Sequence, residues 1–308
     1  MKYFTLLLLA LSIALTSCID VNTKSASTQL EVAAFKSQEE TTNKSATTTA
    51  EVRTDSKNSI SLASWNIRDL GGSKDDKEIY QIAQVLRDFD LVAIQEVVAK
   101  DPKGAQAVAK IADALNRMGS KWDYRVSDPT QSPSVYKSER YAFLWKTSKV
   151  NLVTRPYLDS KLAAICDREP YIAHFKPKKG GDAFYIVNFH SRRFDAHPEE
   201  EIKHFIKYPE RLQTRRVIIA GDFNLDEKHK VWDDFYKQGY KNALSETKTT
   251  LKLKCKYGMY KNHAIDNIYV TKDVKMTKTG SIDIVERCDQ LDNARTLSDH
   301  LPVYIEFQ

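Results

Sequence analysis

Polar side chains that can bind a cation or move a proton follow several apolar segments of the chain. In "VIIAGDFNLDEKH", residues 217–229, an apolar run and a glycine precede Asp222 and Asn224. Alternate residues of an extended chain point the same way, so this carboxylate and this amide should emerge side by side. A single aspartate after a strand is commonly a turn residue. The pair therefore gains meaning only if other strand ends show the same pattern.

The pattern does recur, because other apolar segments end in, or are flanked by, a carboxylate, an amide or an imidazole. These residues are Asn66, Glu96, His190, Asp266, and Asp299 with His300. Mg²⁺ prefers carboxylate and amide oxygens together with water, and substrate phosphate often completes its shell. One histidine can take a proton from water while another gives one to a leaving oxygen. The combination is typical of phosphodiester hydrolysis.

The elements that must position these residues are short strands and helices. Apolar segments predict strands over 59–67, 91–97, 141–145, 183–190, 217–224, 263–270 and 301–307. Helical spacing of apolar residues predicts helices over 77–89, 104–118 and 197–213. Strands mixed with helices in this way predict an α/β protein built on sheets with helices outside.

The first 58 residues predict export and a tether. Residues 1–18 combine Lys2, an apolar run shorter than a membrane span, and "LTSC", which ends at Cys18. The "LTSC" sequence resembles the lipobox of bacterial lipoproteins, which predicts lipidation of Cys18; ordinary signal-peptidase cleavage is the alternative. Residues 19–58 are rich in Ser and Thr and predict a flexible tether. We expect an extracytoplasmic protein, anchored to a membrane or secreted.

Residues 59–308 predict one catalytic domain, since no second linker or internal repeat interrupts them. The net charge of +6 permits an anionic substrate without arguing for one. Outside the cytoplasm Cys255 and Cys288 could form a disulfide, and the odd number of cysteines after Cys18 leaves one unpaired. No cysteine pair has metal-ligand spacing.

Eight segments in unbroken order resemble the endonuclease/exonuclease/phosphatase superfamily and, within it, its deoxyribonuclease I branch. They are "SWNIRDLGG", "LVAIQEV", "YKSERYAFLW", "REPYIAHF", "VNFHS", "IIAGDFNLD", "AIDNIYV" and "LSDHLPVYIEF". The resemblance implies two packed β-sheets flanked by helices, a deoxyribonuclease I-like sandwich with the site at one open end. It also implies roles for single residues.

For the cation, the resemblance implies that Glu96 is the main Mg²⁺ ligand, assisted by Asn66, Asp222 and Asp299. Mn²⁺ is an alternative cation, and Ca²⁺ would be a structural ion. For the scissile phosphate, it implies contacts from Asn224 and Arg168. Tyr136 would stack on the wall of the DNA minor groove.

For proton transfer, the resemblance implies that Asp266 orients His300 and that Glu139 orients His190, with Asp222 close to both reactions. One imidazole would act on the attacking water and the other on the 3′ oxygen, leaving a 5′-phosphate. We favour His300 as the base and His190 as the acid.

Two departures limit the resemblance. Val98 stands where the family places an arginine that enters the minor groove, which lowers the expected DNA affinity and sequence preference. Glu227 and His263 stand where the family has a disulfide near the "DFN" loop.

The sequence therefore predicts a secreted or surface-anchored, Mg²⁺-dependent endonuclease that cuts extracellular duplex DNA with little sequence specificity. We expect a monomer without a protein partner. An alternative is a superfamily member that acts on sphingomyelin or inositol phosphates. Lipid-cleaving relatives tend to carry an exposed aromatic hairpin, and we expect no comparable apolar projecting segment here. A third hypothesis, a non-catalytic adhesion module, is weaker because every expected catalytic residue is present.

Overall fold

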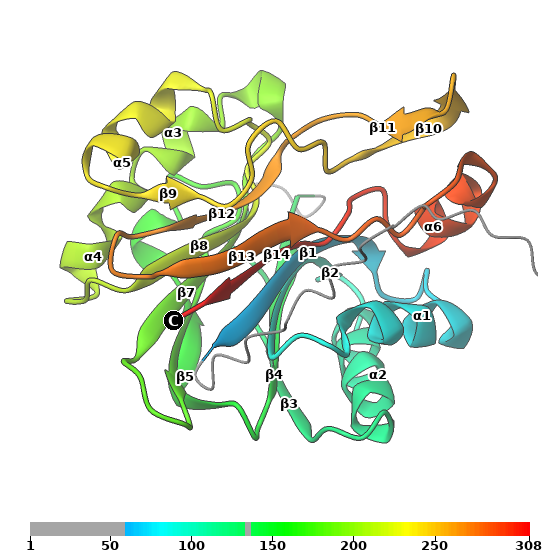
Figure 1. Ribbon diagram of the computed structural model, residues 1–308, viewed down its shortest axis with the longest axis horizontal. Helices are drawn as coiled ribbons and strands as arrows, with labels where there is room; N and C mark the ends of the chain where they lie inside the picture. The colour runs from blue at the N-terminus through cyan, green and yellow to red at the C-terminus, as the bar shows by residue number, and fades with distance from the viewer. Residues whose placement is uncertain (1–58, 133–136) are drawn as a thin grey trace, which may run out of the picture. The chain divides into compact units, whose positions relative to one another are not determined.

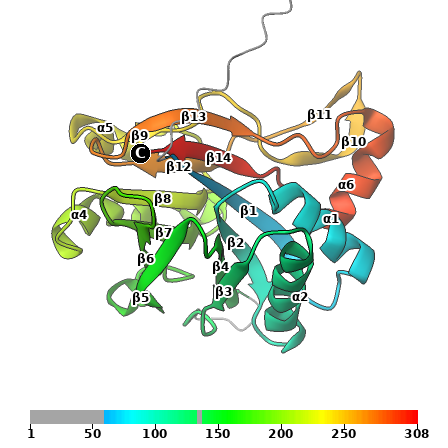
Figure 2. The ribbon, with the colours of Figure 1, turned by 60° about the horizontal axis from the view of Figure 1, so that its bottom comes forward.

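Two six-stranded sheets pack against each other, and helices cover their outer faces (Figures 1 and 2). The computed structural model describes residues 59–132 and 137–308, which lie within one compact unit, Arg53–Gln308. The predictions for residues 1–58, Cys18 included, and for Tyr136 fall outside the described residues. The predicted fold class, a sandwich of two sheets flanked by helices, is confirmed.

The first sheet has the order β13-β14-β1-β2-β4-β3. Its strands are β1 (Ile60–Leu70), β2 (Leu91–Val98), β3 (Trp122–Val126), β4 (Glu139–Lys146), β13 (Met276–Ser281) and β14 (Val303–Phe307). Two helices, α1 (Asp76–Leu86) and α2 (Lys103–Arg117), bury their apolar faces on its outer side. Both helices lie close to their predicted ranges.

The second sheet has the order β5-β6-β7-β8-β12-β9. Its strands are β5 (Val150–Leu158), β6 (Tyr171–Pro177), β7 (Phe184–His190), β8 (Val217–Asp222), β9 (Lys241–Asn242) and β12 (Asp266–Val270). The short helices α3 (Glu199–Ile202), α4 (Tyr208–Arg211) and α5 (Asp233–Lys237) follow β7 and β8 in the chain. Buried aromatic residues such as Phe205, Tyr208 and Trp232 pack this region against the outer face of the sheet.

The prediction of one continuous helix over 197–213 is wrong. The segment forms α3, a 3₁₀ turn at Phe205–Lys207, and α4. Pro209 stands at the beginning of α4. A proline has no backbone N–H to donate and clashes with the carbonyl four residues earlier, so it interrupts a helix that would run through it.

The sequence did not predict five strands of the two sheets: β6, which lies inside the second sheet, and β3, β5, β9 and β13, which lie at the edges. An edge strand pairs on one side only, and several residues of β5 and β13 are exposed. Their residues therefore lack the apolar run that marks the central strands. The ribbon β10 (Leu251–Lys256) and β11 (Met259–Lys261), and the helix α6 (Leu291–Leu297), were also not predicted.

The strand directions explain why the polar strand ends meet. The parallel pairs β1/β2 and β7/β8 end on the same side of the sandwich, where the antiparallel partners β4, β12 and β14 begin. Asp222, at the end of β8, is paired with both His190 and Asp266. The carboxylates and imidazoles therefore converge at one end.

Gly221 allows β7 and β8 to approach closely beneath this end. A Cβ atom at this position would lie 1.7 Å from the carbonyl oxygen of Phe189, which no side chain can tolerate.

Below the site, a buried polar bridge joins the two sheets. Gln95 of β2 donates to the Asn188 side chain of β7 at 2.6 Å, and Asn188 donates to the carbonyl oxygens of Ile94 and Ala142. A buried polar group without a partner is costly, so these bonds favour one alignment of the sheets.

In the described ranges, no helix is long and apolar enough to cross a bilayer.

Candidate active site

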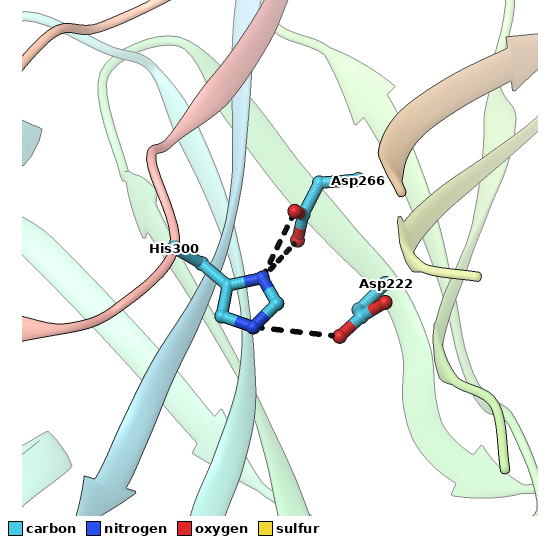
Figure 3. A group of neighbouring side chains, drawn as sticks. All are labelled: Asp222, Asp266 and His300. Atoms are coloured by element: carbon cyan, nitrogen blue, oxygen red, sulfur yellow. Dashed lines mark hydrogen bonds and ion pairs between the residues drawn. The ribbon is translucent and has the colours of Figure 1, made fainter. Parts of the chain in front are cut away.

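Two histidines at the converging strand ends are each held by a carboxylate. His300 Nδ1 lies 3.0 and 2.9 Å from the two oxygens of Asp266, as Figure 3 shows. His190 Nδ1 lies 3.2 and 3.0 Å from the two oxygens of Glu139. A carboxylate on Nδ1 sets the tautomer and the ring orientation, which leaves Nε2 for the reacting atoms. The structure thus forms both predicted pairs.

The two free ring nitrogens face the same carboxylate. Asp222 Oδ2 lies 3.6 Å from His190 Nε2 and 3.8 Å from His300 Nε2. All three side chains are almost completely buried. A phosphate bound next to Asp222 would therefore lie within reach of two imidazoles. His300 would approach it from the first sheet, and His190 from β7 of the second sheet.

The surrounding charges shift the pKa values of these groups. Burial opposes the charged imidazolium of His300, but Asp266 and Asp222 outweigh it and raise its pKa to about 10. Burial also opposes the charged form of His190, yet its pKa is raised too, mainly through Glu139. Burial, together with the charge of Asp266, raises the pKa of Asp222. In this setting His300 holds a proton at neutral pH, which suits an acid. The expected role as base requires a positive charge near Asp222 that lowers this pKa.

Four residues that the sequence did not single out hold the imidazoles in place. Thr249 Oγ1 donates to Asp266 Oδ2 at 2.7 Å, and the His190 backbone N–H donates to the Tyr141 hydroxyl at 3.1 Å. Trp65 Nε1 donates to the carbonyl oxygen of His300 at 2.8 Å, and Ser298 Oγ accepts from the His300 backbone N–H at 3.1 Å. Trp65, Tyr141 and Ser298 lie within the family-like segments "SWNIRDLGG", "YKSERYAFLW" and "LSDHLPVYIEF", whereas Thr249 lies outside all eight segments.

A cluster of oxygen atoms next to the histidines fits a hard cation. Asn66 Nδ2 donates to Glu96 Oε1 at 3.0 Å and to Asp222 Oδ2 at 3.2 Å, which joins three of the predicted metal ligands. Asn66 Oδ1 is buried and has no hydrogen-bond partner. A buried acceptor without a partner is rare, and a divalent cation with oxygen ligands would satisfy it. The donor set therefore fits the implied Mg²⁺.

The backbone around this cluster is strained. Glu96 has a φ of 61° and Asn224 a φ of 50°, both in the left-handed region. Asparagine tolerates this region better than glutamate does. Strained backbone of this kind is found more often at functional sites than elsewhere.

Asp299, the fourth predicted metal ligand, points its carboxylate toward arginines. Its Oδ2 lies 3.5 Å from Arg68 Nη1 and 3.8 Å from Arg295 Nη2. Within the described residues it makes no hydrogen bond to Asn66, Glu96 or Asp222. Hydrogen bonds thus connect three of the four predicted ligands. Asp299, the fourth, forms ion pairs with the two arginines instead.

Asp222, Asp266 and His300 also lie close enough to hold a metal, with one ligand atom of each within 4.8 Å of the others. Asp266 is already bonded to His300 Nδ1 and to Thr249 Oγ1. These bonds support a role for Asp266 in orienting the imidazole, as predicted, rather than in binding the cation.

The two predicted phosphate-binding residues meet at the carbonyl oxygen of Ser191. Arg168 Nη1 donates to it at 2.9 Å and Asn224 Nδ2 at 3.5 Å. Arg168 Nε also lies 3.1 Å from Glu139 Oε2. Burial opposes the charged form of Glu139, but His190 and Arg168 overcome it and lower the pKa of this carboxyl. A cavity of about 240 Å³ lies here, lined in part by Glu96, Glu139, Lys137, Arg168 and His190.

The fold and these residues define a phosphoesterase, and the chain belongs to the endonuclease/exonuclease/phosphatase family. The family model matches residues 63–300. A deoxyribonuclease from Thioalkalivibrio sp. (strain K90mix) is 30% identical over 272 residues, which cover 81% of this chain and 71% of that protein. Deoxyribonuclease-1-like 1 from Cricetulus griseus is 28% identical over 171 residues, covering 54% of this chain and 55% of that protein. The predicted resemblance to deoxyribonuclease I is confirmed.

Solved structures share the fold at lower identity. An endonuclease/exonuclease/phosphatase family protein from Bacteroides thetaiotaomicron is 20% identical, with a TM-score of 0.59, and covers 81% of this chain and 97% of that one. A mannosyl-6-phosphatase from Bacteroides thetaiotaomicron VPI-5482 is also 20% identical, with a TM-score of 0.57, and covers 81% of this chain and 99% of that one. At this identity the similarity shows the fold and does not identify a substrate.

Proposed function

We propose that this protein is a divalent-cation-dependent endonuclease that hydrolyses phosphodiester bonds of DNA. The observation that carries the proposal is the arrangement around Asp222: two imidazoles, each oriented by its own carboxylate, present Nε2 to one side chain. Hydrolysis of an ester in a polymer requires a proton to leave water and another to reach the departing oxygen. Two oriented imidazoles supply both functions.

The chain's own residues account for most of the reaction. Arg168 and Asn224 hold the scissile phosphate, and one imidazole takes a proton from the attacking water. The other protonates the 3′ oxygen, which leaves a 5′-phosphate on the product. Mg²⁺ bound by Glu96, Asn66 and Asp222 would neutralise charge on the phosphate.

DNA is the proposed substrate because the relatives at 24–30% identity carry deoxyribonuclease names. The test is incubation of the purified mature chain with supercoiled plasmid, with and without Mg²⁺. We expect nicked and linear products that EDTA abolishes. Intact plasmid, together with phosphate release from inositol phosphates or phosphocholine release from sphingomyelin, would contradict the proposal and favour the alternative activity.

We also propose that the enzyme acts outside the cytoplasm, because residues 1–18 have the features of a lipoprotein signal. If Cys18 carries lipid, Cys18→Ser should move the protein out of the detergent-soluble membrane fraction or block its processing, since stable anchoring requires more than one acyl chain. Fractionation followed by immunoblotting measures this. Unchanged distribution of Cys18→Ser would leave plain secretion as the better explanation.

Val98 predicts weak DNA binding with little sequence preference. It is the last residue of β2, lies opposite Glu139 of β4, and lines the cavity that contains Glu96 and His190. Val98→Arg should strengthen duplex binding and sharpen the cutting pattern on AT-rich DNA, because a narrow minor groove attracts an arginine. Footprint-style cleavage ladders and binding titrations measure both effects. Val98→Met is the uncharged control, and an equal response from the two variants would mean that DNA crosses this surface differently.

A further inference from the structure

The β10–β11 ribbon forms a separate two-stranded sheet outside the sandwich (Figure 1). Three of its apolar residues are highly exposed: Leu253 at 77%, Tyr257 at 87% and Met259 at 55%. The expectation that the chain has no apolar projecting segment is therefore wrong. The sequence shows no continuous apolar run here, because lysines alternate with the apolar residues in "LKLKCKYGMYK".

The ribbon is firmly attached, although its outer residues are exposed. A disulfide joins Cys255 to Cys288, the pairing that the sequence allowed but left open. Tyr260 donates its hydroxyl proton to Asp283 Oδ2 at 2.7 Å, and Lys261 Nζ lies 2.9 Å from the same oxygen. Such attachment lowers the entropy lost when a partner binds, so the ribbon is a preorganised surface.

One face of β10 carries a row of lysines. Leu251 packs with residues of α6, and Cys255 is bonded to Cys288, so these two residues face the body of the protein. Lys252, Lys254 and Lys256 alternate with these two residues along β10, whose pairing with β11 shifts register here. Lys254 and Lys256 are exposed, and Lys252 is half-buried. None of the three makes an ion pair with a carboxylate of the described chain, and Lys256 Nζ lies only over the Tyr257 ring, 5.8 Å from its centre.

The spacing of these lysines fits a polyanion with regular charges. Alternate residues of a strand are about 6.7 Å apart. One strand of duplex DNA carries a phosphate about every 3.4 Å along the helix axis, so the row corresponds to every second phosphate. An anionic membrane would attract the same lysines but would not require a regular row.

The base of the ribbon is joined directly to the catalytic end of the sandwich. Thr250, next to β10, forms a bridge with His300, and the Leu251 backbone N–H donates to the carbonyl oxygen of Asp299 at 2.7 Å. The neighbouring Thr249 hydroxyl bonds to Asp266. The beginning of the ribbon therefore lies beside His300.

We propose that the β10–β11 ribbon is a second DNA-binding surface, which contacts backbone phosphates of the duplex beyond the scissile bond through Lys252, Lys254 and Lys256. This inference rests on the proposed function. The exposed Tyr257 and Met259, which lie beside Lys256, then contact the sugar edges between phosphates. The ribbon adds affinity that is independent of sequence, which offsets part of what Val98 removes.

The test is the salt dependence of duplex binding by the triple variant Lys252→Ala/Lys254→Ala/Lys256→Ala. A fluorescent 20-base-pair duplex is titrated in EDTA at several salt concentrations, and gel analysis afterwards verifies that the DNA is intact. Each lost phosphate contact lowers the slope of log K against log salt by about 0.9, so we expect a slope smaller by two to three and binding weaker by about 10–100-fold near 0.1 M salt. The loss should be equal for AT-rich and mixed sequences.

The matched control is Lys176→Ala/Lys178→Ala/Lys272→Ala, which removes the same charge from exposed lysines: Lys176 near the end of β6, Lys178 just after it, and Lys272 just after β12. This control should change the slope by less than one. An unchanged slope in the ribbon variant, with wild-type protein that binds and cuts DNA, would overturn the inference and leave the proposed function intact. Wild-type protein that neither binds nor cuts DNA would overturn the proposed function itself.

A separate arm distinguishes DNA from a membrane surface. Two variants are sedimented with vesicles of phosphatidylglycerol and phosphatidylcholine: Leu253→Ala/Tyr257→Ala/Met259→Ala and the ribbon lysine variant. Both are made without residues 1–18, so that no lipid is attached at Cys18. We expect no difference from wild type. If both variants lose vesicle binding and keep the wild-type DNA slope, the ribbon is a membrane-docking surface and the DNA inference is wrong.

Discussion

His190→Ala and His300→Ala should each lower the rate of DNA cleavage by about 10²–10⁴-fold, since acid–base steps typically contribute this much. Both variants remove an Nε2 atom that faces Asp222. The measurement is the initial rate of plasmid nicking under single-turnover conditions, which reports the chemical step. The double variant should be little worse than the slower single variant, because residues that act as a unit are not additive.

His174→Ala is the matched control for the histidine variants. His174 lies on β6, where its ring stacks on Tyr185 at 4.1 Å, away from both catalytic pairs. Its removal should leave the rate within about twofold of wild type, as for a surface substitution without a special role. Near-wild-type nicking by His190→Ala or His300→Ala would show that the acid–base assignment is wrong.

Glu96→Gln should reduce cleavage by about 10²-fold or more at limiting Mg²⁺, because a metal ion stabilises transition-state charge by several kcal/mol and each 1.36 kcal/mol is a tenfold effect. Asn66 Nδ2 donates to Glu96, and the buried Oδ1 of Asn66 has no hydrogen-bond partner. Raising the Mg²⁺ or Mn²⁺ concentration should restore part of the rate. Metal titrations of cleavage, with calorimetric titration of the cation, measure the shift in apparent affinity.

The placement of Asp299 makes a second comparison informative. Because its carboxylate is paired with Arg68 and Arg295, Asp299→Asn should shift the metal dependence less than Glu96→Gln does. Glu306→Gln, on β14 and paired with Lys278, is the control. A wild-type rate that is the same with Mg²⁺ and with EDTA would contradict the metal-dependent mechanism altogether.

The sequence by itself determined the family, all central strands except β6, and the chemical groups of the site. These features depend on local patterns: apolar runs that fill a sheet, followed at their ends by residues such as Glu96, His190 and Asp222. Side-chain alternation and strand ends are properties of a few consecutive residues, so a single sequence displays them. The apolar spacing over 197–213 continues past Pro209, but the proline interrupts the helix. The prediction of one continuous helix from this spacing is therefore wrong.

Only the tertiary structure decided how these groups are held. Trp65 bonds to the backbone of His300 across 235 residues of chain, and Thr249 reaches Asp266 only because its segment folds back beside β12. The ion pair of Asp299 with Arg68 and the attachment of the β10–β11 ribbon through Cys255 and Cys288 also depend on contacts between distant segments. Such contacts leave no periodic signal, because each is a single side chain whose partner is set by the packing of whole sheets. The reacting groups could therefore be identified from the sequence. Their hydrogen-bond and ion-pair partners are determined by the packing of the two sheets.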